Sequence, residues 1–344
     1  MNDGANPGPE PSEEAPLLDG VRQALDTGHP LDLLGMASLL IEATKPDPLA
    51  FLKAGQHREQ LEMDRLLDSF IGVQVRETTA LLTVFAELLD DEDRRRRCRD
   101  EAAARNDDLP RWLTELAHID VYRAVRMTHV LGDSDEVLIG ARLANGDELT
   151  CVAFLDHDTM SAVKDAFFVP GPIDDVVSVA AQSNTDPDRR FIDMDLADAR
   201  AWIEQGPDTP LFWDESDSWP GCRPLLLWLI GHLPEGGRKY ESPEWDSDEL
   251  SEAFFASEYG AGFDRRDYDD LLVALLDVAR DPLRWSVARV GRALGESHYD
   301  VPVKLALHAP DLLRAFIPFA HAQSGIRAEL TAEALAAIDD ITTD

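Results

Sequence analysis

The sequence predicts an α+β protein, mostly helical, with a small antiparallel or mixed β-sheet in the middle and helical N- and C-terminal parts. Apolar residues recur every three to four positions before residue 118 and after residue 246, which is typical of amphipathic helices. Between these regions they recur at every second position, as in strands. Because the strands follow one another directly, the pattern favours α+β over a doubly wound parallel fold. The chain has 344 residues and is 44% hydrophobic, enough for a sizeable core.

The N-terminal part divides into a tail and a helical region. Residues 1–15 contain three prolines and no apolar period, which predicts a disordered tail. Residues 16–118 are predicted to be helical. The strongest evidence is a stripe with the spacing i, i+3, i+4, i+7, formed by Leu81, Val84, Phe85 and Leu88.

Residues 119–205 are predicted to contain the sheet. Strands are expected near 121–127, 136–143 and 148–155, and the last two flank Asn145-Gly146. This dipeptide tolerates positive φ and therefore predicts a hairpin with a type I′ turn. Two further strands are expected near 166–169 and 190–194, with helices near 173–181 and 196–203.

Residues 206–245 form a connection rich in proline and tryptophan, and it includes one apolar helix near 224–233. Because exposed tryptophans are unfavourable in a free linker, we expect this connection to pack on the body of the protein. Residues 246–344 return to a helical period. Asp246, three residues before Glu249, is typical of a helix start.

The charge of the chain is strongly negative. The sequence carries 67 acidic and 32 basic residues, a formal net charge of −35 and a calculated pI near 4.4. Such a field disfavours direct binding to nucleic acid or anionic membranes and attracts basic proteins or cations. The predominance of Arg over Lys also fits general acidity from a GC-rich genome or a salt-adapted proteome, so both explanations stay open.

The location predicted for the protein is cytoplasmic. No run reaches the roughly 18 apolar residues of a membrane span, and the N-terminus lacks the pattern of a secretory signal. The three cysteines, Cys98, Cys151 and Cys222, are widely spaced and odd in number. This spacing predicts neither a disulfide framework nor a Cys-x-x-Cys zinc site.

The first candidate site is Asp156-His157-Asp158, which directly follows a predicted buried strand. Two carboxylates and an imidazole are ligands that divalent metals accept, so the triplet is a candidate metal and catalytic site. It has a superficial similarity to the Asp-His-His element of one phosphoesterase family, but the third residue differs and no matching upstream motifs are present. The competing interpretation is a turn in which Asp158 caps the following helix.

A second candidate is Asp193-Met194-Asp195, after the strand residues Phe191 and Ile192. A phosphotransferase of the haloacid dehalogenase type uses such a carboxylate pair, one as nucleophile and one as acid/base. The residues that should follow are replaced here by Leu196 and Ala197. The competing interpretation is a helix start, with Asp195 as the cap and Asp198 in the first turn.

The segment from Pro282-Leu283-Arg284-Trp285-Ser286 to Pro310–Phe316 resembles segments of actinobacterial proteins of unknown function. The resemblance covers the last third of the chain. It implies a bacterial, cytosolic protein and supplies no catalytic residue.

The function predicted from these observations is that of a non-enzymatic interaction or regulatory protein with a protein partner and no cofactor. The alternative is a metal-dependent hydrolase that uses Asp156, His157 and Asp158, with Asp193 and Asp195 as further ligands. The two hypotheses differ in whether the two strand ends converge in space, which the sequence does not reveal.

Overall fold

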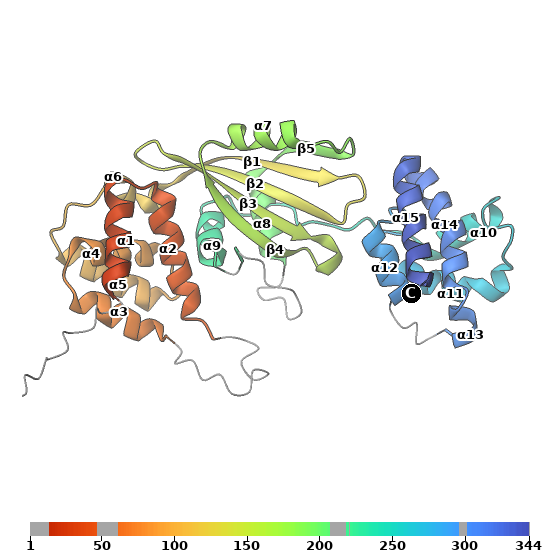
Figure 1. The fold of residues 1–344 in the computed structure, drawn as a ribbon, viewed down its shortest axis with the longest axis horizontal. Helices are drawn as coiled ribbons and strands as arrows, with labels where there is room; N and C mark the ends of the chain where they lie inside the picture. The colour runs from red at the N-terminus through yellow and green to blue at the C-terminus, as the bar shows by residue number, and fades with distance from the viewer. Residues whose placement is uncertain (1–13, 47–60, 207–217, 220, 296–300, 344) are drawn as a thin grey trace, which may run out of the picture.

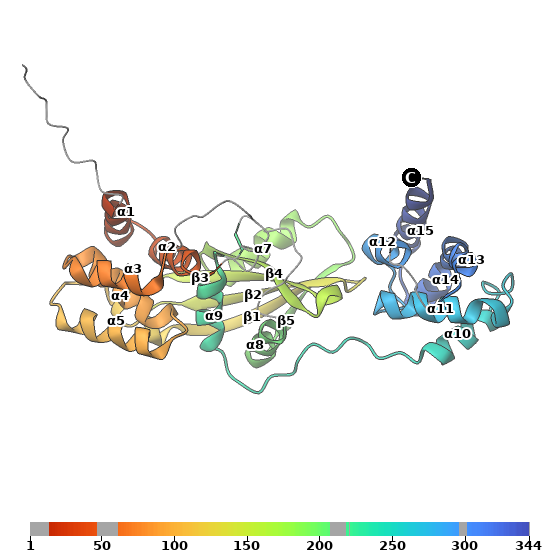
Figure 2. The same cartoon turned by 90° about the horizontal axis from the view of Figure 1, so that it is seen from below.

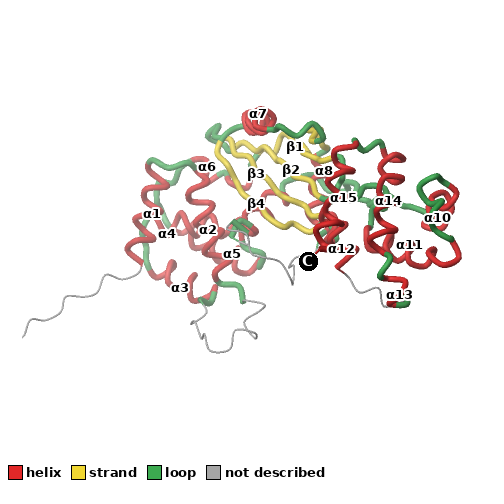
Figure 3. The backbone as a smooth tube through the Cα atoms, turned by 45° about the vertical axis from the view of Figure 1, so that its right-hand side comes forward, coloured by secondary structure: helices red, strands yellow, loops and turns green. Residues whose placement is uncertain are grey.

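The computed structural model describes residues 14–46, 61–206, 218–219, 221–295 and 301–343. A five-stranded antiparallel sheet lies between two groups of helices (Figures 1 and 3). The predicted α+β, mostly helical class is confirmed, and the sheet is antiparallel throughout the described residues. In the described part of the chain, no helix combines the length and apolar character needed to cross a bilayer.

The N-terminal helices pack around one central helix. They are α1 (Glu14–Asp26), α2 (Pro30–Ala43), α3 (Met63–Gly72), α4 (Arg76–Leu88), α5 (Glu92–Ala104) and α6 (Arg111–Thr114). The predicted stripe lies on α4, where Leu81, Val84 and Phe85 are fully buried. α1 begins two residues before the predicted start of the helical region at residue 16. Most of the predicted tail lies outside the described residues.

The sheet has the strand order β4-β3-β2-β1-β5. The strands are β1 (Asp120–His129), β2 (Ser134–Arg142), β3 (Glu148–Asp156), β4 (Ala162–Pro170) and β5 (Arg189–Met194). One face, with Ile139 and Cys151, joins the core of the N-terminal helices. α7 (Ile173–Ser183) packs on Val125, Leu138 and Val152 of the other face, and α8 (Leu196–Gln205) lies on the side opposite α7 (Figure 2).

The hairpin between β2 and β3 is present, but its turn is not the predicted type I′. Gly146 has φ +92°, whereas Asn145 is not among the residues with positive φ, and type I′ requires both. The Gly146 N–H donates to the Leu143 carbonyl, and the Leu143 N–H donates to the backbone carbonyl of Asp147. These bonds fit a type I turn over Ala144 and Asn145 followed by a left-handed glycine. The extra loop residue removes the need for positive φ at Asn145.

Gly146→Val should lower the free energy of unfolding by about 1–2 kcal/mol, because a β-branched side chain resists positive φ. No atom outside the turn lies within 4 Å of the position that a Cβ would take, so the cost comes from the backbone and not from a clash. Gly146→Asn is the matched control, since Asn tolerates the left-handed region. Equal urea denaturation midpoints for wild type and Gly146→Val would contradict the assignment.

The C-terminal unit, defined as residues 247–343, has its own core. Its helices are α10 (Ser247–Ala256), α11 (Arg265–Ala279), α12 (Val287–Gly295), α13 (Val303–Ala306), α14 (Ala309–Ser324) and α15 (Ala328–Thr343). Phe254, Trp285 and Phe316 are fully buried at its centre. This core is distinct from the one shared by the N-terminal helices and the sheet. α9 (Arg223–Gly231) precedes the extended segment that leads to the C-terminal unit (Figure 2).

Candidate functional site

The three residues of the Asp156-His157-Asp158 candidate point to three different sets of partners. Asp156 Oδ1 accepts the Asp158 N–H at 3.0 Å, and its Oδ2 accepts Lys164 Nζ at 2.9 Å. Asp158 binds Arg289 and Arg292, at 3.2 and 2.9 Å. The cap of the short 3₁₀ turn His157–Thr159 is therefore Asp156, and the expectation that Asp158 accepts the capping N–H bonds is wrong. The carboxylate of Asp158 pairs with the two arginines instead of capping the turn.

Asp193 and Asp195 also have structural partners. Asp193 Oδ1 pairs with Arg123 Nη2 at 2.6 Å on the neighbouring strand β1. Asp195 caps α8 by accepting the Ala197 N–H at 2.8 Å, and Asp198 lies in the first turn. The helix-start interpretation of Asp195 and Asp198 is confirmed.

The two candidate groups do not converge. β3 and β5 are separated in the sheet by β2 and β1, and Asp193 lies in register with Val125, Leu138 and Val152. Asp156 is four residues beyond Val152. Asp156 and Asp193 therefore lie roughly 14 Å apart across the sheet and a similar distance along it, given the usual strand spacings. One ion cannot be shared between them.

A different cluster, His129, Asp186 and Asp188, brings three ligand-type side chains within 4.8 Å of one another. The Leu131 N–H donates to His129 Nδ1 at 3.2 Å, so the proton of the neutral ring is on Nε2, which faces Asp186 at 3.3 Å. Binding a metal through Nε2 would require that proton to move to the nitrogen that already accepts an N–H. Asp188 is paired with Arg327. The cluster therefore stabilises the local turn and the contact with Arg327, and its geometry does not favour metal binding.

The most organised polar group is a buried network that sequence reasoning did not find. His157 Nε2 lies 2.9 Å from Asp135 Oδ2, and His157 Nδ1 lies 3.0 Å from Ser161 Oγ. All three residues are buried. Met160 and Ser161 both have φ +56°, a left-handed conformation that is unfavourable for residues other than glycine. An acid–imidazole–hydroxyl chain is the order that serine hydrolases use, so access to Ser161 decides what this network can do.

Aromatic rings close the network. Tyr240 stacks on His157 with ring centroids 3.6 Å apart and planes within 8°. Trp202 packs edge-on against both rings. Gln205 holds Tyr240 in place through two hydrogen bonds with its backbone, and burial raises the pKa of the Tyr240 phenol. With Ser161 only 2% exposed, the network has no room for a substrate in this conformation.

Sequence reasoning missed this network because Asp135, on β2, and His157, in the turn after β3, are 22 residues apart. The one local signal is the spacing of four between His157 and Ser161, which lets the hydroxyl reach the ring within one tight turn. The partner Tyr240 comes from the segment after α9, and nothing in the sequence marks it as a neighbour of His157.

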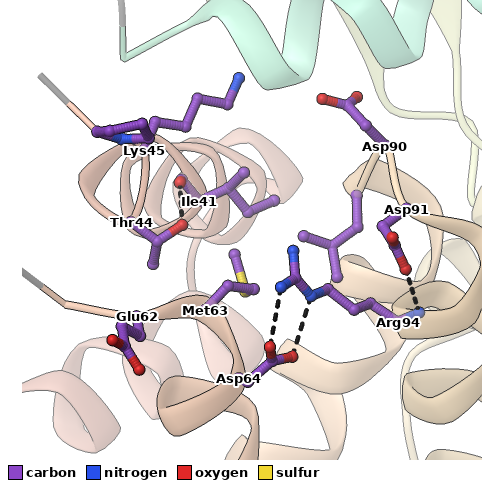
Figure 4. A pocket seen from close by; sticks show the side chains of 11 residues that line it. Ile41, Thr44, Lys45, Glu62, Met63, Asp64, Asp90, Asp91 and Arg94 are labelled. Atoms are coloured by element: carbon purple, nitrogen blue, oxygen red, sulfur yellow. Dashed lines mark hydrogen bonds and ion pairs between the residues drawn. The ribbon is translucent and has the colours of Figure 1, made fainter. Parts of the chain in front are cut away.

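A cavity of about 380 Å³ lies at the end of α2, between the start of α3 and the α4–α5 turn (Figure 4). Its wall includes the apolar Ile41, Met63 and Leu89. Arg94 makes two hydrogen bonds to Asp64, at 3.0 and 2.9 Å, and these two charges compensate each other. Carboxylates also line it, but among the described residues no three of them lie within ligand distance of one another. Neither it nor the cavity of about 460 Å³ beside α8 borders Ser161.

Comparison with known proteins found no matching family model, no matching curated protein and no matching solved structure. The resemblance of residues 282–316 to actinobacterial proteins stays a prediction. The chemistry of the sites described above therefore follows from their geometry alone.

Divalent ions are expected to leave the melting temperature unchanged, because the carboxylates of residues 156–158 already have protein partners. A metal bound at this turn would stabilise the fold by mass action, about 2.7 kcal/mol at a concentration 100 times its dissociation constant. The measurement is thermal unfolding with Mg²⁺, Mn²⁺ or Zn²⁺, for the wild type and Asp156→Ala. A rise in melting temperature that Asp156→Ala abolishes would support the hydrolase hypothesis instead.

Proposed function

We propose that this protein is a non-enzymatic interaction protein whose helices α10 and α11 bind a basic segment of a partner protein. The observation that carries the proposal is the charge of residues 246–277, which include ten acidic and two basic residues. This net charge of −8 is about a quarter of a charge per residue, against about a tenth for the whole chain. A concentrated field attracts a basic partner, whereas a uniform one mainly keeps molecules apart.

The acidic side chains of this segment are largely uncompensated. Nine of the ten are exposed, and within the described residues the ion pairs of the segment are those of Arg265 with Glu252 and Asp269. The acidic cluster Asp90–Asp93 differs, because two of its four carboxylates, Glu92 and Asp93, pair with arginines of α5. A third cluster, Asp214–Asp217, lies outside the described residues. The charge of α10 and α11 is thus the best supported candidate for a binding surface.

Two exposed aromatic side chains accompany this charge. Trp245 precedes α10 and is 40% exposed, and Tyr259, between α10 and α11, is 38% exposed. Aromatic faces attract guanidinium and ammonium groups, so they add to the preference for an Arg- or Lys-rich partner. Three cations of the same unit are engaged elsewhere, since Arg289, Arg292 and Arg327 pair with carboxylates of the sheet region.

The test is binding of a fluorescent 20-residue Arg/Lys-rich peptide to two variants that each lose four negative charges. The first neutralises α10 and α11 through Asp248→Asn, Glu249→Gln, Asp267→Asn and Asp270→Asn. The control neutralises four exposed carboxylates elsewhere through Asp100→Asn, Asp175→Asn, Glu333→Gln and Asp340→Asn.

We expect the first variant to raise the dissociation constant at least tenfold and the control less than threefold. Affinity should also fall as salt rises, because the screening length drops from about 10 Å at 0.1 M to about 3 Å at 1 M. Equal weakening in both variants would mean that the charge acts as a general field, and the proposed surface would be wrong.

A further inference from the structure

The C-terminal unit contacts the sheet mainly through arginine side chains. Arg289 of α12 is 2% exposed and lies against the end of the sheet. Its Nε donates to Asp158 Oδ1 at 3.2 Å, and its Nη1 donates to the Leu131 carbonyl at 2.9 Å. Its Nη2 reaches the Gly132 carbonyl and Asp133 Oδ1, both at 3.2 Å. One guanidinium from the C-terminal unit thus binds two carbonyls and two carboxylates of the loop and turn at this end.

Two further ion pairs join the C-terminal unit to the sheet region. Arg292 Nη2 binds Asp158 Oδ2 at 2.9 Å, and Arg327 of the loop before α15 pairs with Asp188. In each pair the C-terminal unit supplies the cation and the sheet region supplies the carboxylate. Burial raises the pKa of the nearby Asp133 and Asp281 carboxyls. The attraction within these ion pairs is opposed by the cost of removing their charges from water.

The apolar part of the interface is small. Leu131 of the sheet region packs with Ile326 and Leu330 of the C-terminal unit, with Val130 at the margin. The two large cores do not merge, because each unit buries its own set of apolar residues. Separating the units would therefore leave both cores intact.

Two of the attachments of the C-terminal unit meet on one tight turn, residues 156–161, which we call the docking turn. Asp158 of this turn binds α12, while the neighbouring His157 stacks on Tyr240 of the segment that leads to α10. The same turn contains Met160 and Ser161 with φ +56°. Strained backbone of this kind persists only while surrounding contacts hold it.

We propose that the docking turn is a conformational latch that holds the C-terminal unit on the sheet through Arg289, Arg292 and Tyr240, and that the unit is released when these contacts are lost. Release turns the C-terminal unit into a separately folded body on a flexible connection. It also uncovers Leu131, Ile326 and Leu330. This inference does not depend on the basic partner proposed above.

The experiment measures the distance between spin labels on the two units by pulsed electron paramagnetic resonance. The labels are placed at Ser178→Cys on α7 and Glu333→Cys on α15, both at exposed positions. Cys222 is only partly buried and is replaced by Ser, whereas the buried Cys98 and Cys151 are retained. Circular dichroism of each variant checks that the helices remain.

The docked protein should give one narrow distance distribution. Arg289→Met combined with Arg292→Met should broaden it to longer distances, and Tyr240→Ala, which removes the stacking on His157, should act in the same direction. Arg314→Met is the control, since it removes pairs with Asp311 and Asp339 inside the C-terminal unit only, and it should leave the distribution narrow.

A narrow, unchanged distribution in the arginine double variant would overturn the latch. If that variant loses its helical signal, Asp158→Asn provides the second measurement, because it weakens both arginine contacts with an isosteric side chain. A distribution unchanged by Asp158→Asn would equally overturn the proposal. Broadening by the arginine variant without any effect of Tyr240→Ala would exclude a shared turn.

Discussion

Replacing His157 with Leu is expected to lower the free energy of unfolding by about 3 kcal/mol. The imidazole is the close partner of both Asp135 and Ser161, at 2.9 and 3.0 Å. Asp135 is 3% exposed and its Oδ1 already has no hydrogen-bond partner. Without the ring, the ion pair left to Asp135 among the described residues would be that with Arg126, at 3.7 Å, and the stacking on Tyr240 would be lost.

The measurement is urea denaturation followed by circular dichroism, with Ser161→Ala as the control. That substitution removes one hydroxyl and leaves the contacts of His157 with Asp135 and Tyr240, so it should cost only about 1 kcal/mol. A loss below 1 kcal/mol for His157→Leu would show that the buried network is not structural. Its resemblance to a catalytic triad would then need a functional explanation.

Acidification from pH 7 to pH 5 should destabilise the C-terminal unit by about 2 kcal/mol through His321 alone. His321 Nε2 accepts a hydrogen bond from the backbone N–H of Trp285 at 3.0 Å, and His321 Nδ1 lies 2.9 Å from Thr331 Oγ1. Burial lowers the pKa of His321 from 6.5 to about 4. A proton on Nε2 would break the bond to Trp285 and place a charge in the core.

The direction of this pH effect follows from the protonation of His321 in the folded and the unfolded chain. Below pH 6.5 the unfolded chain takes up a proton at this ring while the folded unit does not, so stability present at pH 7 declines as the pH falls towards 4. Asp133 and Asp281 oppose this trend, because burial raises the pKa of their carboxyls. The informative quantity is therefore the difference between wild type and His321→Gln.

Unfolding free energies of both proteins at several pH values between 7 and 4.5 would give that difference. We expect the stability advantage of wild type over His321→Gln to shrink by about 2 kcal/mol at pH 5. Parallel pH profiles for the two proteins would contradict a neutral, buried His321. A direct titration of the ring by nuclear magnetic resonance would locate its pKa independently.

The docking turn gives a structural explanation for the candidate metal site that the sequence predicts at residues 156–158. Asp156, His157 and Asp158 were selected because adjacent carboxylates and an imidazole at a strand end suggest a metal site. In the folded chain each of these side chains is committed to a different contact, and two of them attach the C-terminal unit. A dense polar triplet at a strand end can thus serve assembly within the chain as well as chemistry.

Local patterns in the sequence were enough to predict the elements that depend on neighbours along the chain. The helical stripe of α4, the strands β1 to β3 and the start of α8 at Asp195 all appear where the apolar pattern and capping residues placed them. The turn type at Asn145-Gly146 was wrong because the dipeptide also fits a longer loop in which only the glycine is left-handed. A local motif restricts the backbone without determining how many residues the loop contains.

The sequence by itself determined the fold class, the order of the elements and the unusual charge, because each depends on composition or on spacings of two to four residues. Only the tertiary structure decided which polar groups meet. Asp135 reaches His157 across strand pairing, and Arg289 reaches Asp158 from 131 residues away. Such pairs are selected by the packing of whole elements. Once buried, their charges can be compensated only by the groups that this packing places beside them.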